Sequence, residues 1–517
     1  MKLLAWLSCL LALVVLLQCK SDVQRSNEEI EQLTGKELSK RYCASCHLYP
    51  QPDQLDKNTW HQFVLPRMAA FMGIYTDGRQ YFDKMPDQWI EPGEGGERVR
   101  RAHIYPKKPI LSREEWTKIF DYYVQKAPSK LSRTYRSEIK LGIPGFESKP
   151  FLTNSVISPL IQSVTFDSKS KRIYLAEMEG GLFTYSSEGR LVNTFRGERF
   201  IVDMRVEGTT LKALDMGSRI ASDNPKGSYL DYDLEGKVMT EESRISSLMR
   251  PVAAVEGQLD DDDDQEIVIC EFGNLLGQIA VYDPEQKSLK LISLNVDDGY
   301  VSVELADMNQ DGKVDIVALQ GNSNEGIDIF WNEGDLQFRR ERVLIFQPTS
   351  GSTHMNLVDY NQDGKLDILY CSGDNGDYTP INKPYHGIYI YLSEGPIFKQ
   401  SLFLPMNGVY QAEAQDFDQD GDLDIVAVAF HPDFINSPRS SFQYFENKQN
   451  QFESYTVSQY NHARWMRFMV EDIDSDDDMD ILLTAMNIKT PDVPADVASV
   501  WRSKDLPVLL IENQLNK

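Results

Sequence analysis

The chain reads DMNQDGKVD at residues 307–315, and closely related stretches occupy residues 359–367, 416–424 and 472–480. All four follow the pattern D-x-[DN]-x-D-[GD]-x-x-D and are followed by isoleucine. A looser fifth copy, at residues 258–266, has glutamine in place of the first aspartate and glutamate in place of the last. Because the five copies begin 49 to 57 residues apart, the sequence predicts a repeat architecture.

The spacing of the acids in these copies is typical of a loop that binds a hard cation. Oxygen ligands at positions 1, 3, 5 and 9 can converge on Ca²⁺, and glycine at position 6 permits a sharp turn. An EF-hand would need glutamate at position 12 and flanking helices, whereas residues 316–318 and 425–427 predict strands. We therefore expect four to five bound Ca²⁺ ions. The expected ligands are Asp260, Asp262, Glu266, Asp307, Asn309, Asp311, Asp315, Asp359, Asn361, Asp363, Asp367, Asp416, Asp418, Asp420, Asp424, Asp472, Asp474, Asp476 and Asp480.

Each repeat carries enough strand pattern for four strands. In one unit the strands are expected at residues 301–305, 316–319, 327–331 and 338–344. Four-stranded units at this period predict propeller blades. Two upstream units, around residues 181–185 and 228–232, keep the strand pattern without the acidic loop. Five plus two units predict an all-β, seven-bladed propeller over residues 145–513.

The ends of this region indicate how the ring closes. The last unit ends at residues 508–513, which predict only its third strand. Residues 145–148 read GFES and echo QFES at 451–454, the fourth strand of the preceding unit. We expect the earlier segment to complete the last blade, which removes an exposed sheet edge. Cys270 and Cys371 occupy equivalent places two blades apart, too distant for a disulfide, and are expected to be buried thiols.

The acidic loops resemble the FG-GAP (integrin-type, VCBS-like) calcium repeats of β-propellers. This resemblance implies that the propeller is a calcium-stabilised body that docks a partner protein or a polysaccharide. The net charge of −26 argues against nucleic acid as a partner.

A second motif, CASCH at residues 43–47, stands ahead of the repeats. The pattern C-x-x-C-H is typical of covalent haem c attachment, with Cys43 and Cys46 bonded to the haem and His47 as the proximal iron ligand. A zinc site would need two more ligands, and no second C-x-x-C exists. A thioredoxin-like pair would not need His47, and no βαβ pattern surrounds it.

The surrounding residues, 35–130, predict a small all-α domain of the cytochrome c type. Helices are expected over residues 35–42 and 60–73, and a capping box at residues 112–115 opens a third. Spacing alone does not identify the sixth iron ligand. The candidates are Met68, Met72, Met85, His61 and His103.

The W-x7-M pattern from Trp60 to Met68 resembles exported bacterial cytochrome c domains fused to FG-GAP repeats. That resemblance implies Met68 as the axial ligand. Met85, which precedes Pro86, remains the main rival, because Met-Pro is common at this position in small cytochromes c.

The chain begins with a largely apolar run that ends near Leu17, as in a signal peptide. The residues around Cys19 resemble a bacterial lipobox, although Gln18 stands where a small residue is usual. We expect a signal peptide at 1–19, lipidation of Cys19, and a tether at 20–34. The protein would then be exported to the periplasm or cell surface and held at the membrane by a lipid anchor.

Together these features predict an exported mono-haem electron-transfer protein, with a redox partner protein and a calcium-stabilised propeller as docking or binding module. Two alternatives remain. One is a propeller oxidoreductase that passes electrons from a substrate to its own haem, and the other is an adhesion protein with a haem sensor. An electron carrier is favoured over a catalyst, because the repeats lack the tryptophan docking pattern of quinone-dependent propellers.

Overall fold

The computed structural model describes residues 32–516, except 77–79, 83–84, 86, 133–137, 154–155, 235–239, 261, 263, 285–289, 375–380 and 396. The chain forms two compact units. The first comprises Met1–Pro86 and Tyr105–Lys130, and the second comprises Asp87–Ile104 and Leu131–Lys517. The expected signal peptide, Cys19 and most of the tether lie outside the described residues. No helix in the described part of the chain is long and apolar enough to cross a membrane.

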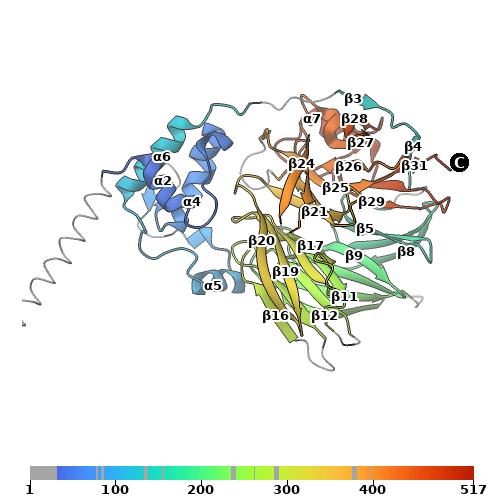
Figure 1. The fold of residues 1–517 in the computed structure, drawn as a ribbon, viewed down its shortest axis with the longest axis horizontal. Helices are drawn as coiled ribbons and strands as arrows, with labels where there is room; N and C mark the ends of the chain where they lie inside the picture. Colours follow the sequence, from blue (N-terminus) through green and yellow to red (C-terminus); the bar gives the residue numbers. More distant parts are fainter. Residues whose placement is uncertain are drawn as a thin grey trace, which may run out of the picture. The chain divides into compact units, whose positions relative to one another are not determined.

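The first unit is mainly helical (Figure 1). Its helices and turns are α2 (Gly35–Cys43), α3 (Lys57–Thr59), a π-helical turn (Trp60–Val64), α4 (Leu65–Phe71) and α6 (Arg113–Lys126), with a 3-10 turn at Pro52–Gln54 and a short hairpin of β1 (Tyr75–Thr76) and β2 (Tyr81–Phe82). Helix α6 begins with the expected capping box, in which Ser112 and Glu115 exchange side-chain and backbone hydrogen bonds. The three helices expected from the sequence are therefore present.

The core of this unit lies where α2 meets α6. A Cβ on Gly35 would lie 2.0 Å from the backbone oxygen of Lys118, so only glycine permits this close approach of the two helices. Trp60 and Tyr123 are buried with ring centroids 4.6 Å apart. The Trp60 indole donates to the Pro52 carbonyl at 2.9 Å, which satisfies its one polar group inside the core.

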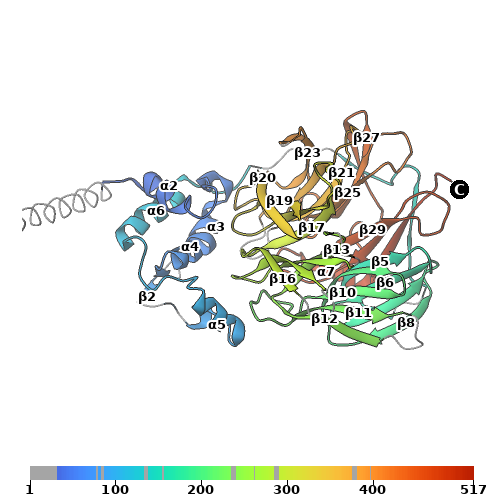
Figure 2. The same cartoon turned by 60° about the horizontal axis from the view of Figure 1, so that its bottom comes forward.

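The second unit is a propeller of seven sheets (Figures 1 and 2). Blades one to four are β5 (Ile161–Asp167), β6 (Arg172–Glu177), β7 (Gly181–Ser186), β8 (Leu191–Arg196); β9 (Ile201–Glu207), β10 (Thr210–Asp215), β11 (Gly227–Asp233), β12 (Thr240–Leu248); β13 (Pro251–Gly257), β14 (Glu266–Glu271), β15 (Gln278–Asp283), β16 (Lys290–Asn295); and β17 (Tyr300–Ala306), β18 (Asp315–Gln320), β19 (Gly326–Gly334), β20 (Gln337–Ile345). Blades five and six contain β21 (Ser352–Val358), β22 (Asp367–Ser372), β23 (Gly387–Ser393), β24 (Phe398–Pro405); and β25 (Val409–Gln415), β26 (Asp424–Ala429), β27 (Phe442–Lys448), β28 (Gln451–Thr456). The seven-bladed prediction is confirmed.

The ring closes as the sequence predicts. Blade seven contains β29 (Trp465–Glu471), β30 (Asp480–Ala485) and β31 (Val508–Asn513), and its fourth strand is β4 (Phe146–Pro150). Strand β4 pairs antiparallel with β31, with Ser148 opposite Ile511. One strand was not foreseen: β3 (Ile139–Leu141) adds to β28 in parallel and gives blade six a fifth strand.

Apolar burial explains why each unit folds as a blade. In blades three to seven every residue of the second strand is buried, as expected for continuous runs such as β18 that face neighbouring blades on both sides. Cys270 and Cys371 lie in two of these strands, are fully buried and are free thiols, which confirms that prediction. Burial raises the pKa of both thiols.

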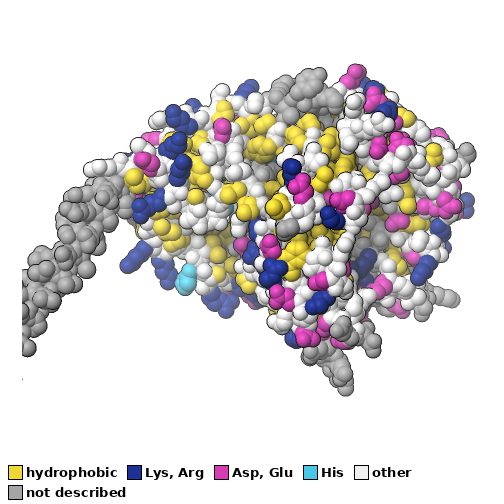
Figure 3. Space-filling model, viewed as in Figure 1, with side chains coloured by type: hydrophobic (Ala, Val, Ile, Leu, Met, Phe, Trp, Pro, Cys, Tyr) yellow, Lys and Arg dark blue, Asp and Glu magenta, His cyan; other side chains and the backbone are white. Residues whose placement is uncertain are grey.

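Residues 87–104, which the sequence analysis places in the helical domain, group with the propeller. This segment contains α5 (Glu94–Arg101). Its anchor is Glu91, whose carboxylate accepts hydrogen bonds from the Ser222 hydroxyl and the Asn224 amide, each at 2.6 Å, and from the backbone of Asp223. The space-filling view shows Lys and Arg side chains gathered on the helical unit, and acidic side chains scattered over the propeller (Figure 3).

Candidate functional site

The five acidic loops each join the first strand of a blade to its second, in blades three to seven. The first aspartate of each close copy organises the turn. In blade four, Asp307 accepts from the backbone of Asp311 at 3.0 Å and of Gly312 at 2.8 Å. In blade five, Asp359 accepts the equivalent bonds at 3.0 and 2.9 Å. The repeated carboxylate therefore folds each loop around itself, in the way that an Asx turn does.

Two positions of the loop have left-handed backbone. Gln310, at position 4, has φ 60°, and Gly312, at position 6, has φ 88°. Glycine carries no steric penalty at the second position, which explains the recurring glycine there. In blade seven Asp477 stands at position 6 with φ 66°. This loop therefore has a strained backbone at that position, and it carries one more carboxylate than a loop with glycine there.

The aspartate at position 9 ties the loop to the blade. Asp315 is fully buried, and its two oxygens accept from the backbone of Met308 at 3.1 Å and of Asn332, on the third strand, at 2.8 Å. Asp367 and Asp480 make the same pair of bonds. These carboxylates already accept hydrogen bonds from the backbone of the blade, and their role as cation ligands stays a prediction.

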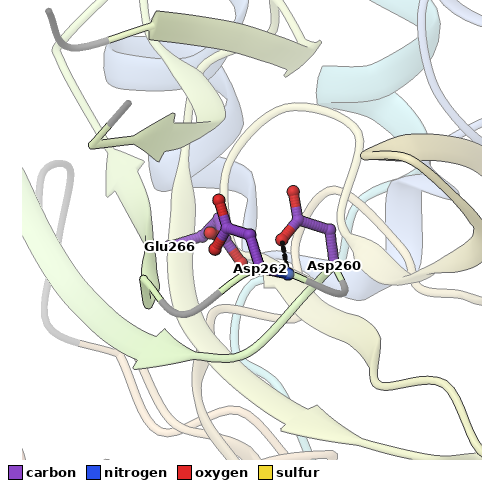
Figure 4. Close-up of side chains that lie close together, drawn as sticks. All are labelled: Asp260, Asp262 and Glu266. Carbon is purple, nitrogen blue, oxygen red and sulfur yellow. Dashed lines mark hydrogen bonds between the residues drawn. The ribbon is translucent and has the colours of Figure 1, made fainter. Parts of the chain in front are cut away.

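Three loops bring carboxylates together, and the hydrogen bonds within each cluster come from backbone nitrogens rather than from another carboxyl group. The clusters are Asp260, Asp262 and Glu266; Asp416, Asp418 and Asp420; and Asp472, Asp474 and Asp476, with one ligand oxygen of each residue within 4.8 Å of the others. Figure 4 shows the first cluster, in which the backbone nitrogen of Asp262 donates to Asp260 at 3.1 Å.

Each of these clusters contains one buried oxygen without a hydrogen-bond partner in the described structure. These atoms are Glu266 Oε1, Asp416 Oδ1 and Asp476 Oδ2. A buried carboxylate oxygen is costly unless something positive satisfies it. The residues present therefore fit a hard cation such as Ca²⁺, whose preferred ligands are carboxylate oxygens.

The pKa values of the loop carboxyl groups reflect the same cost of burying negative charge. Burial, and then the charges of Asp260 and Asp262, raise the pKa of Glu266 to about 7. Burial raises the pKa of Asp480 to about 7, and burial together with Asp474 raises that of Asp476 to about 6. A bound cation would reverse these shifts by favouring the ionised form.

The loops of blades four and five are different, because asparagine stands at position 3. The Asn309 amide oxygen accepts from the backbone of Asp311 at 2.9 Å, while its amide nitrogen donates to the Asp311 carboxylate at 3.0 Å. Asn361 and Asp363 repeat this arrangement. In these two loops an asparagine amide donates a hydrogen bond to the carboxylate at position 5, whereas the all-acid loops have no amide at position 3 that could do so.

Glutamine at position 4 links neighbouring loops. The Gln310 side chain of blade four donates to the Gly364 carbonyl of blade five at 2.9 Å. Gln362 of blade five donates to the Gly421 carbonyl of blade six at 2.7 Å. The sequence analysis missed these bonds, although the recurrence of glutamine at position 4 is a signal that could have found them.

The C-x-x-C-H motif begins at the last residue of α2 in the first unit and continues beyond the helix. Cys43 is the last residue of the helix, its thiol is half-buried, and burial raises its pKa to about 12. Cys46 is exposed. The Nδ1 of His47 lies 2.8 Å from the Leu48 carbonyl, which can only accept, so Nδ1 carries the proton and Nε2 the lone pair. A backbone carbonyl in this position is a usual orienting partner of an iron-ligating histidine, so these residues fit a haem.

The candidates for the sixth ligand are spread over the first unit and beyond it. Met68 lies in α4, and it and Met85 are half-buried. The His61 ring packs edge-to-face on Phe120 with centroids 5.2 Å apart. His103 lies in the segment that groups with the propeller. The choice of Met68 stays a prediction.

The fold and its loops thus define a seven-bladed β-propeller with acidic metal-type loops. The FG-GAP-like repeat family model matches residues 307–370 and 416–483, which shows that the chain carries repeats of this kind. A search of curated proteins found no match.

Several solved structures are similar at low identity. Saccharomyces cerevisiae Sqt1 is 11% identical, with 68% of this chain and 84% of that one covered and a TM-score of 0.43. The Neurospora crassa Pan2 WD40 domain is 10% identical, with 66% and 94% covered and a TM-score of 0.43. The Dos1 propeller is 13% identical, with 68% and 77% covered and a TM-score of 0.43. At these scores the likenesses carry no argument about function.

Proposed function

We propose that this protein is an exported mono-haem c electron-transfer protein whose propeller, stabilised by four to five Ca²⁺ ions, is a docking or binding module. The observation that carries the haem assignment is the orientation of His47. Its Nδ1–H donates to the Leu48 carbonyl, so Nε2 is left as the ligand atom beside two cysteines at the spacing of a haem attachment site.

Each residue has a stated part in holding the group. Cys43 and Cys46 would form the two thioether bonds, and His47 would be one axial ligand with Met68 as the other. Bound haem supplies one-electron chemistry. Methionine rather than a second histidine on the iron would raise its reduction potential. The chain would exchange single electrons with a redox partner protein.

The test is a redox titration with absorption spectra of wild type, Met68→Ala and Met85→Ala, expressed in a host that attaches haem c. We expect covalent haem in all three proteins and loss of the methionine-ligated spectrum in Met68→Ala only. Loss in Met85→Ala only would replace the axial assignment. Absence of covalent haem from the wild type, with Cys43→Ser as the matched blank, would overturn the function itself.

The calcium assignment is supported by the three buried, unpartnered carboxylate oxygens of the loops. The expected result of a calorimetric titration of metal-free protein is uptake of four to five Ca²⁺ ions per chain. Uptake of none would contradict the proposal without bearing on the haem.

Export and membrane anchoring rest on the sequence of the first nineteen residues. Cys19 would carry the lipid. Fractionation of cells that express wild type and Cys19→Ala tests this: the wild type is expected with membranes and the variant in the soluble exported fraction. Recovery of both proteins in the same fraction would exclude the anchor.

A further inference from the structure

The two faces of the propeller differ in their loops. One face carries the acidic loops, while the opposite face carries the connections between second and third strands. In blades one, three and four these connections are short, at residues 178–180, 272–277 and 321–325. In blade two the connection is residues 216–226. In blades five, six and seven the connections are residues 373–386, of which 375–380 lie outside the described part, 430–441 and 486–507, the last of which contains α7 (Ala495–Lys504). Long loops grouped on neighbouring blades of a rigid scaffold are a common place for binding sites.

A histidine–aspartate pair joins two of these long loops. His431 Nδ1, from blade six, lies 3.1 Å from Asp492 Oδ2, from blade seven. Thr490 donates to the other oxygen of Asp492. Burial alone would raise the pKa of Asp492, but the hydrogen bonds from His431 and Thr490 and the charge of Arg464 hold it at about 2. The carboxylate is therefore ionised and can only accept, so the Nδ1 that faces it at 3.1 Å carries the proton, and the Arg464 guanidinium, a donor 3.3 Å from the same nitrogen, makes no second bond there. This leaves the Nε2 lone pair of His431 to accept a hydrogen bond.

Arg464 holds this pair in place. Its side chain is fully buried, and its guanidinium donates to the carbonyls of Phe430 at 2.7 Å and Ile488 at 2.8 Å. The same group lies 3.4 Å from Asp492 and 3.8 Å over the ring of Phe430. Because the planar donors of arginine bind several acceptors at once, both loops are fixed relative to His431.

Polar groups of blade five complete the cluster. The Asn407 amide donates to Asn382 at 2.6 Å and to the backbone carbonyl of His431 at 3.1 Å. His386 is buried, and burial, followed by the charge of Lys383, lowers the pKa of its ring well below the usual value. The backbone of Ser350 approaches His386, but neither ring nitrogen makes a hydrogen bond of normal geometry. Unused imidazole nitrogens beside ordered amides are unusual in a merely structural contact.

We propose that His431, held by Asp492 and Arg464, is the hydrogen-bond acceptor of a sugar-binding site on this face of the propeller. The proposal deepens the binding role proposed for the propeller and rests on it. It names the ligand class as a neutral, polyhydroxylated compound.

The charges of the cluster argue for a neutral ligand. Arg464 is committed to carbonyls and to Asp492, and Lys383 donates to the carbonyls of Thr349 at 2.9 Å and Asp374 at 3.2 Å. Neither of these two cations is left to attract an acidic ligand, and the guanidinium of Arg467 lies 4.9 Å from the centroid of the Tyr410 ring. Imidazole and amide groups instead offer uncharged donors and acceptors, as sugar hydroxyls require.

Aromatic rings border the same loops. Phe430 contacts the His431 ring with centroids 4.9 Å apart, and Tyr410 lies 6.1 Å from Phe430. All three side chains keep partial exposure. The Arg464 guanidinium covers one face of Phe430 and the Arg467 guanidinium one face of Tyr410, so a sugar would contact only what these rings leave exposed. Apolar rings beside a few fixed polar groups are the usual composition of a small-molecule site.

The test is saturation-transfer NMR of the full-length, haem- and calcium-loaded protein with glucose, galactose, mannose, xylose and N-acetylglucosamine. We expect transfer to at least one sugar and its loss, by at least fivefold, in His431→Ala. His431→Gln should keep part of the signal, because its amide oxygen can accept in place of Nε2. Asp492→Asn should weaken it, because the histidine proton is no longer fixed on Nδ1.

His462→Ala is the matched control, since His462 lies in the connection between blades six and seven and outside this cluster; it should bind as wild type does. Transfer to none of the five sugars, or equal transfer in wild type and His431→Ala, would overturn the proposal. Haem absorbance and calcium content measured on the same samples keep that outcome separate from a failure of the proposed function.

Discussion

The acidic loops of blades four and five and those of blades three, six and seven show two solutions to one electrostatic problem. In the first group an asparagine amide at position 3 donates to the acid at position 5. In the second group position 3 is an acid, and a buried oxygen is left unpartnered. Blades one and two fold without an acidic loop of this pattern, and blade two joins its first two strands through Gly208, whose φ is 59°. The loops are therefore not needed to specify a blade, and we expect the all-acid loops to depend most on a cation.

Chelation should have the largest effect. Removing Ca²⁺ leaves the carboxylates of several loops to repel one another, so we expect a loss of about 5 kcal/mol or more in the free energy of unfolding of the propeller. A melting curve with and without chelator measures this as a fall in Tm of several degrees. An unchanged Tm would contradict the expected dependence of the all-acid loops on a cation.

Glu413 tests whether a half-buried acid outside the acidic loops makes the stability of the propeller depend on pH. It lies half-buried on an inner strand, and burial, followed by the charges of Glu471 and Glu304, raises its pKa to about 7. Between the unfolded pKa of about 4.5 and 7, the folded chain holds a proton that the unfolded chain has lost, so stability falls as pH rises through this window.

Glu413→Gln removes that titration. We expect it to stabilise the calcium-loaded protein by about 2 kcal/mol at pH 8 and to have little effect at pH 5, allowing for partial exposure. Denaturant unfolding at the two pH values measures this. Equal effects at both would mean that Glu413 is not the costly group.

Reciprocal substitutions at position 3 sharpen the comparison directly. Asp418→Asn should turn the blade six loop into the amide type and weaken its calcium affinity about tenfold, or about 1.4 kcal/mol. Asn309→Asp should strengthen the blade four site and destabilise the metal-free protein. Calorimetric titration of both variants is the measurement, and affinities that move in the same direction would contradict the charge-count argument.

The smallest effect concerns the links between loops. Gln310→Ala and Gln362→Ala each remove a bond to the next blade and should cost about 1 kcal/mol and reduce the cooperativity of calcium uptake. Gln419→Ala is the matched control, because this residue has the same backbone conformation, with φ 56°, and makes no such bond among the described residues. Equal losses in all three variants would mean that the loops act independently.

The parts that sequence could predict are local. The acidic loops, the strand runs behind them and the capping box before α6 each lie within a dozen residues, and the closing strand β4 could be found because it echoes a repeat. The three residues of β3 carry no such pattern. Glu91 and Ser222 are 131 positions apart in the sequence, and His431 and Asp492 are 61 apart. Contacts over such separations produce no local sequence motif, so they could not be predicted.

The closing strand has a consequence for the order of events in synthesis. Strand β4 is made before any complete blade, but its partner β31 is made last, and the ion pair at 2.7 Å between Lys149 and Glu512 spans 363 positions. A ribosome that stops early leaves a ring with an open edge, which is prone to association with other chains. Closure across such a separation is intrinsically slow. Completion of the ring therefore acts as a check on length, because only a chain translated through β31 can close.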